Sequence, residues 1–188
     1  MNVTSTTISN TTQIIHGIMQ TITNPIVTFI LGFLISYFTM PKVARVAHKR
    51  ELSKVSTQLG EGLGERFQKF QRALNSYNNK ANVDATDFFE ISTAGQIYFD
   101  YMKIICDAIL SKNIGPDSAI NTHFPNIKDA AKNTLPLFYK ILQEIAQKNN
   151  FTFNGRLRKD HYQSIINVLK KYLDDSEVES IIGNWDDN

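Results

Sequence analysis

The chain has no Lys, Arg, Asp or Glu before Lys42, although its 188 residues include 20 basic and 18 acidic side chains. An uncharged segment of this length is typical of a protein that enters lipid. A helix buried in the core of a soluble protein is the alternative interpretation. A cleaved signal peptide fits less well, because its basic residues would precede the apolar run and here they follow it.

Other absences exclude several kinds of site. The single cysteine, Cys106, cannot form a disulfide within one chain, and its apolar neighbours predict a small buried thiol. The four histidines are far apart, and there is no cysteine pair or His-Glu-x-x-His helix, so we expect no metal and no cofactor. The net charge of +2 gives no indication of bulk nucleic-acid binding.

The apolar part of the uncharged segment covers residues 25–40. As a helix it would be roughly 24 Å long, which is short of the roughly 30 Å hydrocarbon core of a bilayer. The preceding residues can extend it, because isoleucines and Met19 recur there at helical spacing. We therefore predict a transmembrane helix over about 14–40 within an N-terminal segment 1–41, followed by a helical domain over 42–188.

Basic residues gather directly after the predicted span, at Lys42, Arg45, Lys49 and Arg50. An excess of Lys and Arg marks the cytoplasmic flank of a membrane helix. The predicted topology is therefore a single pass with the N-terminus outside and the C-terminal body in the cytoplasm.

Polar and small residues recur every three or four positions along the predicted span, at Asn24, Thr28, Gly32, Ser36 and Thr39. This spacing places them in one stripe on a helix, and small residues four apart let two membrane helices approach closely. A lone helix would expose their amide and hydroxyl groups to hydrocarbon, whereas a homo-oligomer could turn them toward water. The stripe predicts a pore lining; the alternative is that the hydroxyl groups bond to their own helix.

After Lys42 the residues fall into amphipathic helical blocks without the alternation of strands, which predicts an all-α fold and a single helical bundle. We expect a bend or loosened stretch at Gly60–Gly64 and a helix capped by Asp84 or Thr86. Further helices should begin at Asn126, with a kink or split at Pro136, near Tyr162 and after Ser176. Trp185 should lie in a frayed end. The helix after Asp84 should supply much of the core, through Phe88, Phe89, Ile97, Tyr101, Ile104, Ile105, Ala108 and Ile109.

One short motif has the composition of an RNA-cleaving site. Arg156 and His161 are separated by four residues at the expected start of a late helix. A histidine can move the proton of a 2′-hydroxyl, and an arginine can stabilise charge on the phosphate. The alternative is a basic helix start that forms ion pairs with Asp160 or with a neighbouring chain.

A single span, a helical cytoplasmic body and this Arg-x4-His pair together resemble the small membrane accessory protein of type VI-B CRISPR systems, a divergent HEPN-like family. The resemblance implies a HEPN-like bundle, a ring-shaped homo-oligomer, thought to be an octamer, and a location in the bacterial inner membrane. It also implies antiviral defence beside an RNA-guided RNase as functional partner. The chain departs from the HEPN pattern at Leu157, where HEPN nucleases usually have a polar residue.

Two functions are consistent with these features. In the first, the protein is a membrane pore that permeabilises or depolarises the inner membrane downstream of the RNase, and it is not an enzyme. In the second, it is a membrane-tethered, metal-independent HEPN-type endoribonuclease that binds RNA and uses Arg156 and His161. An inert membrane adaptor would have neither activity.

Overall fold

The computed structural model describes residues 25–80, 84–150 and 152–185, with the backbone alone for 25–40. These residues form helices and connecting loops without any strand, which confirms the all-α class. The contacts within the chain place a boundary after Lys49, eight residues beyond the predicted boundary at Pro41. The second unit, Arg50–Asn188, is compact. The elements are α2 (Pro25–Asn78), α3 (Ala85–Leu110), α4 (Pro116–Ser118), η1 (Ala119–His123), α5 (Phe124–Asp129), η2 (Ala130–Thr134), α6 (Leu135–Lys148), η3 (Lys159–Tyr162), α7 (Gln163–Tyr172) and α8 (Asp175–Ile182).

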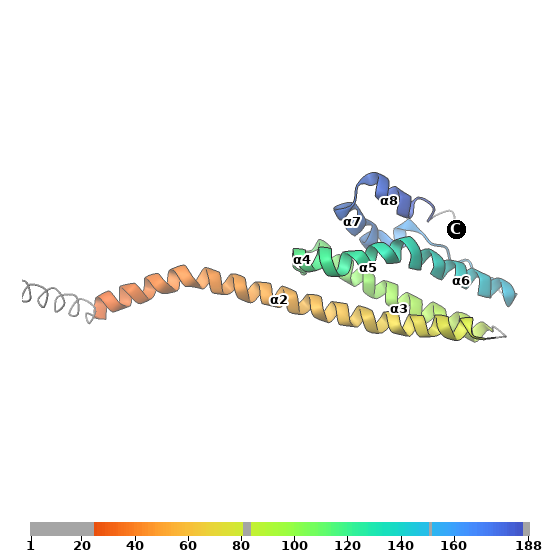
Figure 1. Ribbon diagram of the computed structural model, residues 1–188, viewed down its shortest axis with the longest axis horizontal. Coiled ribbons are helices and arrows are strands. Elements are labelled where there is room, and N and C mark those ends of the chain that lie inside the picture. Colours follow the sequence, from red (N-terminus) through yellow and green to blue (C-terminus); the bar gives the residue numbers. More distant parts are fainter. Residues whose placement is uncertain (1–24, 81–83, 151, 186–188) are drawn as a thin grey trace, which may run out of the picture. The chain divides into compact units, whose positions relative to one another are not determined.

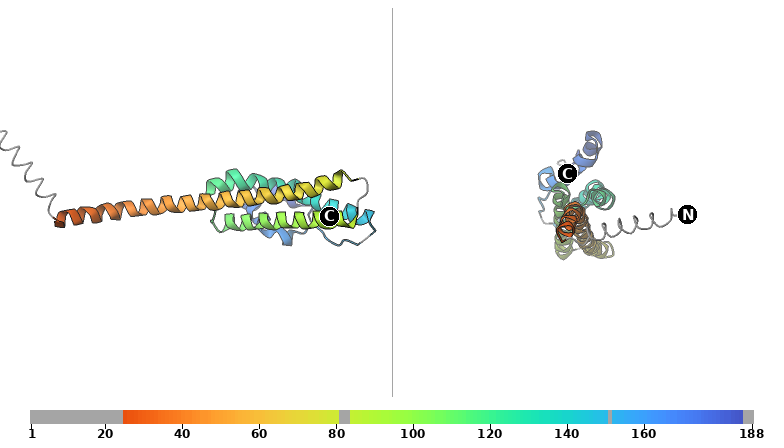
Figure 2. Two further views of the ribbon diagram at one scale, coloured as in Figure 1. Left: turned by 90° about the horizontal axis from the view of Figure 1, so that it is seen from below. Right: turned by 90° about the vertical axis from the view of Figure 1, so that its left-hand side faces the viewer.

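The prediction of a loosened stretch at Gly60–Gly64 is wrong, because α2 is helical without a break to Asn78. These glycines serve packing at one position in particular. A Cβ on Gly62 would lie 2.3 Å from the hydroxyl oxygen of Tyr101, so a larger residue here would force the Tyr101 ring to move. Nearby, Phe67 of α2 contacts Tyr98 of α3 with ring centroids 5.3 Å apart, and the two helices run side by side (Figure 2).

Asp84 caps α3, as the sequence predicts. Its carboxylate accepts hydrogen bonds from the backbone N–H groups of Thr86 and Asp87, and the Asp87 carboxylate accepts one from the backbone N–H of Asp84. This reciprocal arrangement is a capping box, which satisfies N–H groups that have no partner inside the helix. Asp87 is buried and also forms an ion pair of 2.6 Å with Lys80. The connection between α2 and α3 is therefore held at its α3 end.

A helical run from Pro116 to Lys148 contains two π-helical turns, η1 and η2. Each is followed within two residues by a proline, Pro125 in α5 and Pro136 in α6. Proline cannot donate a backbone hydrogen bond and its ring clashes with the carbonyl four residues earlier. A wider turn before it relieves both problems, so the predicted disruption at Pro136 takes the form of η2. The prediction that Asn126 begins this helix is wrong, because Asn126 lies inside α5.

Helix α3 packs against α6 and α7 (Figure 1). A cluster of aromatic rings fills the space between them, with Phe138 of α6 5.7 Å from Phe70 and 5.3 Å from Phe99 between ring centroids. The indole of Trp185 extends the cluster, 6.0 Å from the ring of Tyr162, and is buried. The expectation of a frayed Trp185 is therefore wrong. The end of the chain up to this residue is part of the core.

The final helix begins earlier than predicted. Asp174 is the N-cap of α8, and its carboxylate accepts a hydrogen bond from the backbone N–H of Glu177. Ser176 lies inside the helix, and its hydroxyl donates to the same carboxylate. Aspartate at this position satisfies a free N–H group and places a negative charge at the positive end of the helix.

Three predicted core residues of α3 lie on the surface. Phe89 is 66% exposed, Ile97 50% and Ile104 53%. The other faces of α3 are occupied by α2, α6 and α7, and the described residues leave this face uncovered. Phe88, Ile105 and Ile109 are buried as expected.

Candidate functional site

The predicted catalytic pair lies between α6 and α7. Arg156 is in the extended segment before η3, and His161 is inside η3; both are exposed. Leu157 points the other way and is 1% exposed, within the hydrophobic core. The residue that departs from the HEPN pattern is therefore an anchor for this segment.

The closest described ion pair in this segment does not involve Arg156 or His161. Arg158 forms an ion pair of 2.6 Å with Asp160, whose other carboxylate oxygen lies 3.9 Å from Nε2 of His161. Among the described contacts, Arg156 has neither a hydrogen bond nor an ion pair. Catalytic arginine and histidine side chains need supporting groups that hold them in a productive orientation. As placed in one chain, Arg156 and His161 form a basic, solvent-exposed surface that can attract phosphate.

The side chains of the predicted pore-lining residues lie outside the described part of the protein. Asn24 is not described, and Thr28, Gly32, Ser36 and Thr39 belong to α2 through their backbone alone. The predicted span of about 14–40 is likewise described only from residue 25, and only through its backbone. Among the residues whose side chains are described, no helix is both long and apolar enough to cross a bilayer.

The predicted basic flank is on α2. Lys42, Arg45, Lys49 and Arg50 are all exposed, as are Val43 at 65% and Val46 at 52%. Residues 42–50 of α2 therefore carry exposed cationic side chains along their length. Such groups interact favourably with anionic lipid headgroups, at about 1 kcal/mol per residue near the surface.

A buried polar pair, missed from the sequence, joins α2 to η1. Oγ of Ser56 and Nε2 of His123 are 2.9 Å apart, and both residues are buried. Burial lowers the pKa of His123, and the hydrogen bond with Ser56 offsets this only in part. Among the described contacts no carboxylate touches His123, so its ring is held by Ser56 and lacks the acidic partner that commonly orients a catalytic histidine. A lone histidine in a polar helical block carries no signal that would have identified this pair.

His123 also lines a groove of about 450 Å³ between α2 and the η1–α5–η2 run. The aromatic ring of Tyr98 lines it together with Asn126 and Asp129. Burial, together with the Asp129 carboxylate, raises the pKa of Tyr98 to about 12, so its hydroxyl keeps its proton at neutral pH. The groove offers neutral hydrogen-bonding groups and one carboxylate.

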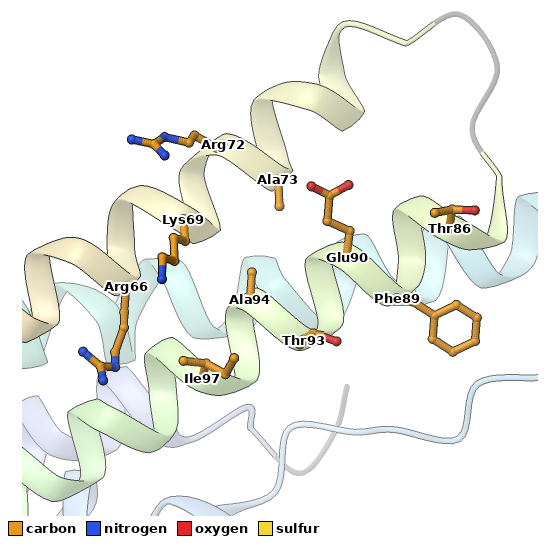
Figure 3. A pocket seen from close by; sticks show the side chains of 10 residues that line it. All are labelled: Arg66, Lys69, Arg72, Ala73, Thr86, Phe89, Glu90, Thr93, Ala94 and Ile97. Atoms are coloured by element: carbon orange, nitrogen blue, oxygen red, sulfur yellow. The ribbon is translucent and has the colours of Figure 1, made fainter.

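A second and larger groove of about 690 Å³ lies between α2 and α3 (Figure 3). Its apolar surface comes from the exposed face of α3 together with Ala73, and Arg66, Lys69 and Arg72 line it from α2. The sequence shows the apolar residues of this groove through their helical spacing in α3, but that spacing predicted burial in the core. We call this site the α2–α3 groove.

The part of the chain that the structure describes contains neither a group of metal ligands nor an accessible thiol. No group of three or more His, Cys, Asp or Glu side chains could hold a metal ion among these residues. Cys106 is fully buried, and burial raises the pKa of its thiol, which opposes formation of the reactive thiolate. This agrees with a structural role for Cys106.

Comparison of the chain with protein-family models, curated proteins and solved structures finds no match.

Proposed function

We propose that the protein is a homo-oligomeric membrane pore whose uncharged N-terminal helices line a water-filled path. The observation that carries the proposal is the distribution of charge: no charged side chain occurs in 41 residues, and an exposed basic stretch follows at once. This order is that of a membrane helix followed by its cytoplasmic flank. On this proposal the span covers about 14–40, and the body lies on the cytoplasmic side of a bacterial inner membrane.

The polar stripe distinguishes a pore from a simple anchor. An anchor has no need for Asn24, whose amide cannot be satisfied within its own helix as readily as a hydroxyl group can. In a ring of helices the stripe faces a shared interior, where water satisfies the amide and hydroxyl groups. Helix α2 begins at Pro25 and contains the second part of the predicted span, the basic flank and the first helix of the bundle.

The place of this pore in the cell rests on the family resemblance. We propose a divergent HEPN-like bundle that serves antiviral defence and acts downstream of an RNA-guided CRISPR RNase. The pore would permeabilise or depolarise the membrane once target RNA has been recognised. In this setting Arg156, His161 and Arg158 are a basic surface of the bundle.

The ribonuclease alternative has less support. Its pair, Arg156 and His161, is exposed, and Arg158 is the arginine that Asp160 holds. A HEPN active site also requires two such motifs facing each other, which one chain does not supply. Cleavage would therefore require a second copy that meets this particular surface.

Dye efflux from vesicles that contain the purified full-length protein tests the proposal. We expect efflux from the natural sequence and its loss when Asn24→Leu and Thr28→Leu are combined. The matched control combines Ile26→Leu and Ile30→Leu on the opposite face of the helix and should retain efflux. Efflux that persists unchanged in the Asn24 and Thr28 variant would refute the pore. RNA cleavage that disappears in an Arg156→Ala, His161→Ala variant, without efflux from any protein, would favour the ribonuclease.

A further inference from the structure

The groove of about 450 Å³ that Tyr98 lines has the composition of a small-molecule site, and we call it the Tyr98 groove. Helix α2 forms one wall, η1, α5 and η2 form another, and α3 contributes Tyr98. Pockets for small organic molecules measure about 300–1,000 Å³ and combine apolar surface with a few polar groups. Leu63 and Phe67 supply the apolar surface here, and Asn126 and Asp129 are among the polar groups.

The phenol of Tyr98 is the group that points to a ligand. Tyr98 is 5% exposed, and its ring contacts those of Phe70 and Phe99 at centroid distances of 5.9 Å and 4.9 Å. Buried tyrosine hydroxyl groups usually have a hydrogen-bond partner, yet among the described contacts this one has none. Burial and, to a lesser extent, the Asp129 carboxylate raise the pKa of Tyr98, which indicates that its hydroxyl group is on the side of the groove where Asp129 lies. A fixed ring therefore presents an unpaired hydroxyl group to the groove.

Two glycines keep the α2 side of the groove open. Gly60 and Gly64 both line it and are four residues apart, so they share one face of α2. A Cβ at Gly64 would have no atom within 4 Å, and one at Gly60 would lie 3.8 Å from Cε1 of His123. Glycine destabilises a helix interior relative to alanine, so the stability of α2 does not explain why this space is left empty.

The charge of the groove selects the kind of ligand. Asp129 is exposed, and one of its carboxylate oxygens accepts a hydrogen bond from the amide of Asn133. The described residues that line the groove include no Lys or Arg, and Lys128 beside Asp129 is paired with Glu177 of α8. His123 adds no positive charge at neutral pH, because burial lowers its pKa. An anionic ligand would therefore face a carboxylate without a compensating cation, whereas a cation would be attracted.

We propose that the Tyr98 groove binds a small organic ammonium ion, a primary amine with an apolar body. An ammonium group has only N–H donors, and the groove offers it two acceptors, the Asp129 carboxylate and the unpaired phenol oxygen of Tyr98. The rings of Phe67 and Tyr98, with centroids 5.3 Å apart, offer aromatic surface to the apolar body, and aromatic faces also attract cations. This binding goes beyond the proposed pore and does not depend on it.

Calorimetric titration of the full-length protein in detergent with phenethylamine tests this site. Two probes of similar size serve as controls, the neutral 2-phenylethanol and the anionic phenylacetate. We expect saturable binding of phenethylamine, binding of 2-phenylethanol that is weaker by about tenfold, and no binding of phenylacetate. Equal affinity for phenethylamine and 2-phenylethanol, or the absence of saturable phenethylamine binding, would overturn the proposal.

Variants of the full-length protein locate the site. Asp129→Asn keeps the shape of the side chain and should lower the association constant for phenethylamine about fivefold to fiftyfold. Glu144→Gln is the matched control, because Glu144 is also exposed but lies on α6 outside the groove, and it should leave the affinity unchanged. Gly64→Leu fills the open space of the groove and should abolish binding. Unchanged affinity in Asp129→Asn or in Gly64→Leu, with the variant folded by circular dichroism, would overturn the proposal.

Discussion

Two glycines in helix interiors provide a sensitive test of the described packing. Gly95 of α3 faces α6, and a Cβ added there would lie 2.3 Å, 2.7 Å and 2.9 Å from three carbons of the Phe138 ring. That ring cannot swing away, because Phe70, Phe99 and Tyr139 surround it at centroid distances of 5.3 to 5.7 Å. Gly64 of α2 has no atom within 4 Å of the position of a Cβ.

The substitution of alanine should therefore affect stability differently at the two positions. Both variants gain helix propensity, about 0.5–1 kcal/mol in the free energy of unfolding. Gly95→Ala also overpacks the core, which costs about 1–3 kcal/mol. We expect Gly64→Ala to be stabilised by about 0.5–1 kcal/mol, and Gly95→Ala to be less stable than Gly64→Ala by about 1–3 kcal/mol.

Urea unfolding of the full-length variants measures this difference. Trp185 is the only tryptophan and is buried, so its fluorescence reports loss of the core. Circular dichroism of the helices should give the same midpoint if the unit unfolds cooperatively. Equal stability of the two variants would refute the close approach of α3 and α6 that the structure shows at Gly95.

Three further predictions concern the cap, the buried histidine and the anchor of the Arg156 segment. Asp84→Ala should lower the free energy of unfolding by about 1 kcal/mol, measured by urea titration, whereas Asp84→Asn should retain most of the cap. The lowered pKa of His123 means that the unfolded state binds its proton more readily; stability should fall as pH decreases below about 6.5, by at most about 1.4 kcal/mol per pH unit, and His123→Gln should lose this component. Leu157→Asn, which introduces the HEPN-type residue, should cost about 2–5 kcal/mol because it removes a buried side chain and buries an amide, and a smaller loss would contradict the anchoring role.

Local signals in the sequence were sufficient for much of the fold. The helix that begins after Asp84 was predicted because a cap and the following apolar spacing lie within one segment. Both the side chain that accepts and the N–H groups that donate are close in sequence, so no knowledge of the rest of the protein is needed.

The errors arose where the cause lies far away in the sequence. Gly62 suggests flexibility until Tyr101, which lies in another helix, is known to pack against it. Phe89 and Ile97 have core spacing, yet the described residues leave both of these side chains at least half exposed. Trp185 follows a short helix and precedes acidic residues, and only the aromatic ring of Tyr162 explains its burial.

The candidate site was predicted less completely than the fold. Arg156 and His161 could be found from their spacing, but their exposure and the pairing of Asp160 with Arg158 follow from the path of the segment between α6 and α7. The Ser56–His123 pair and the α2–α3 groove each combine residues from helices distant in sequence. Spacing within one segment contains no information about such combinations.

The most direct test of the central claim is the conductance of planar bilayers that contain the full-length protein, measured before and after a charged thiol reagent is added. With Ser36→Cys on the polar stripe, we predict a conductance that the reagent blocks. Leu34→Cys on the opposite side should conduct equally and remain unaffected, and the buried Cys106 should not react. Absence of conductance, or equal block of the two variants, would contradict a pore lined by the uncharged N-terminal helix.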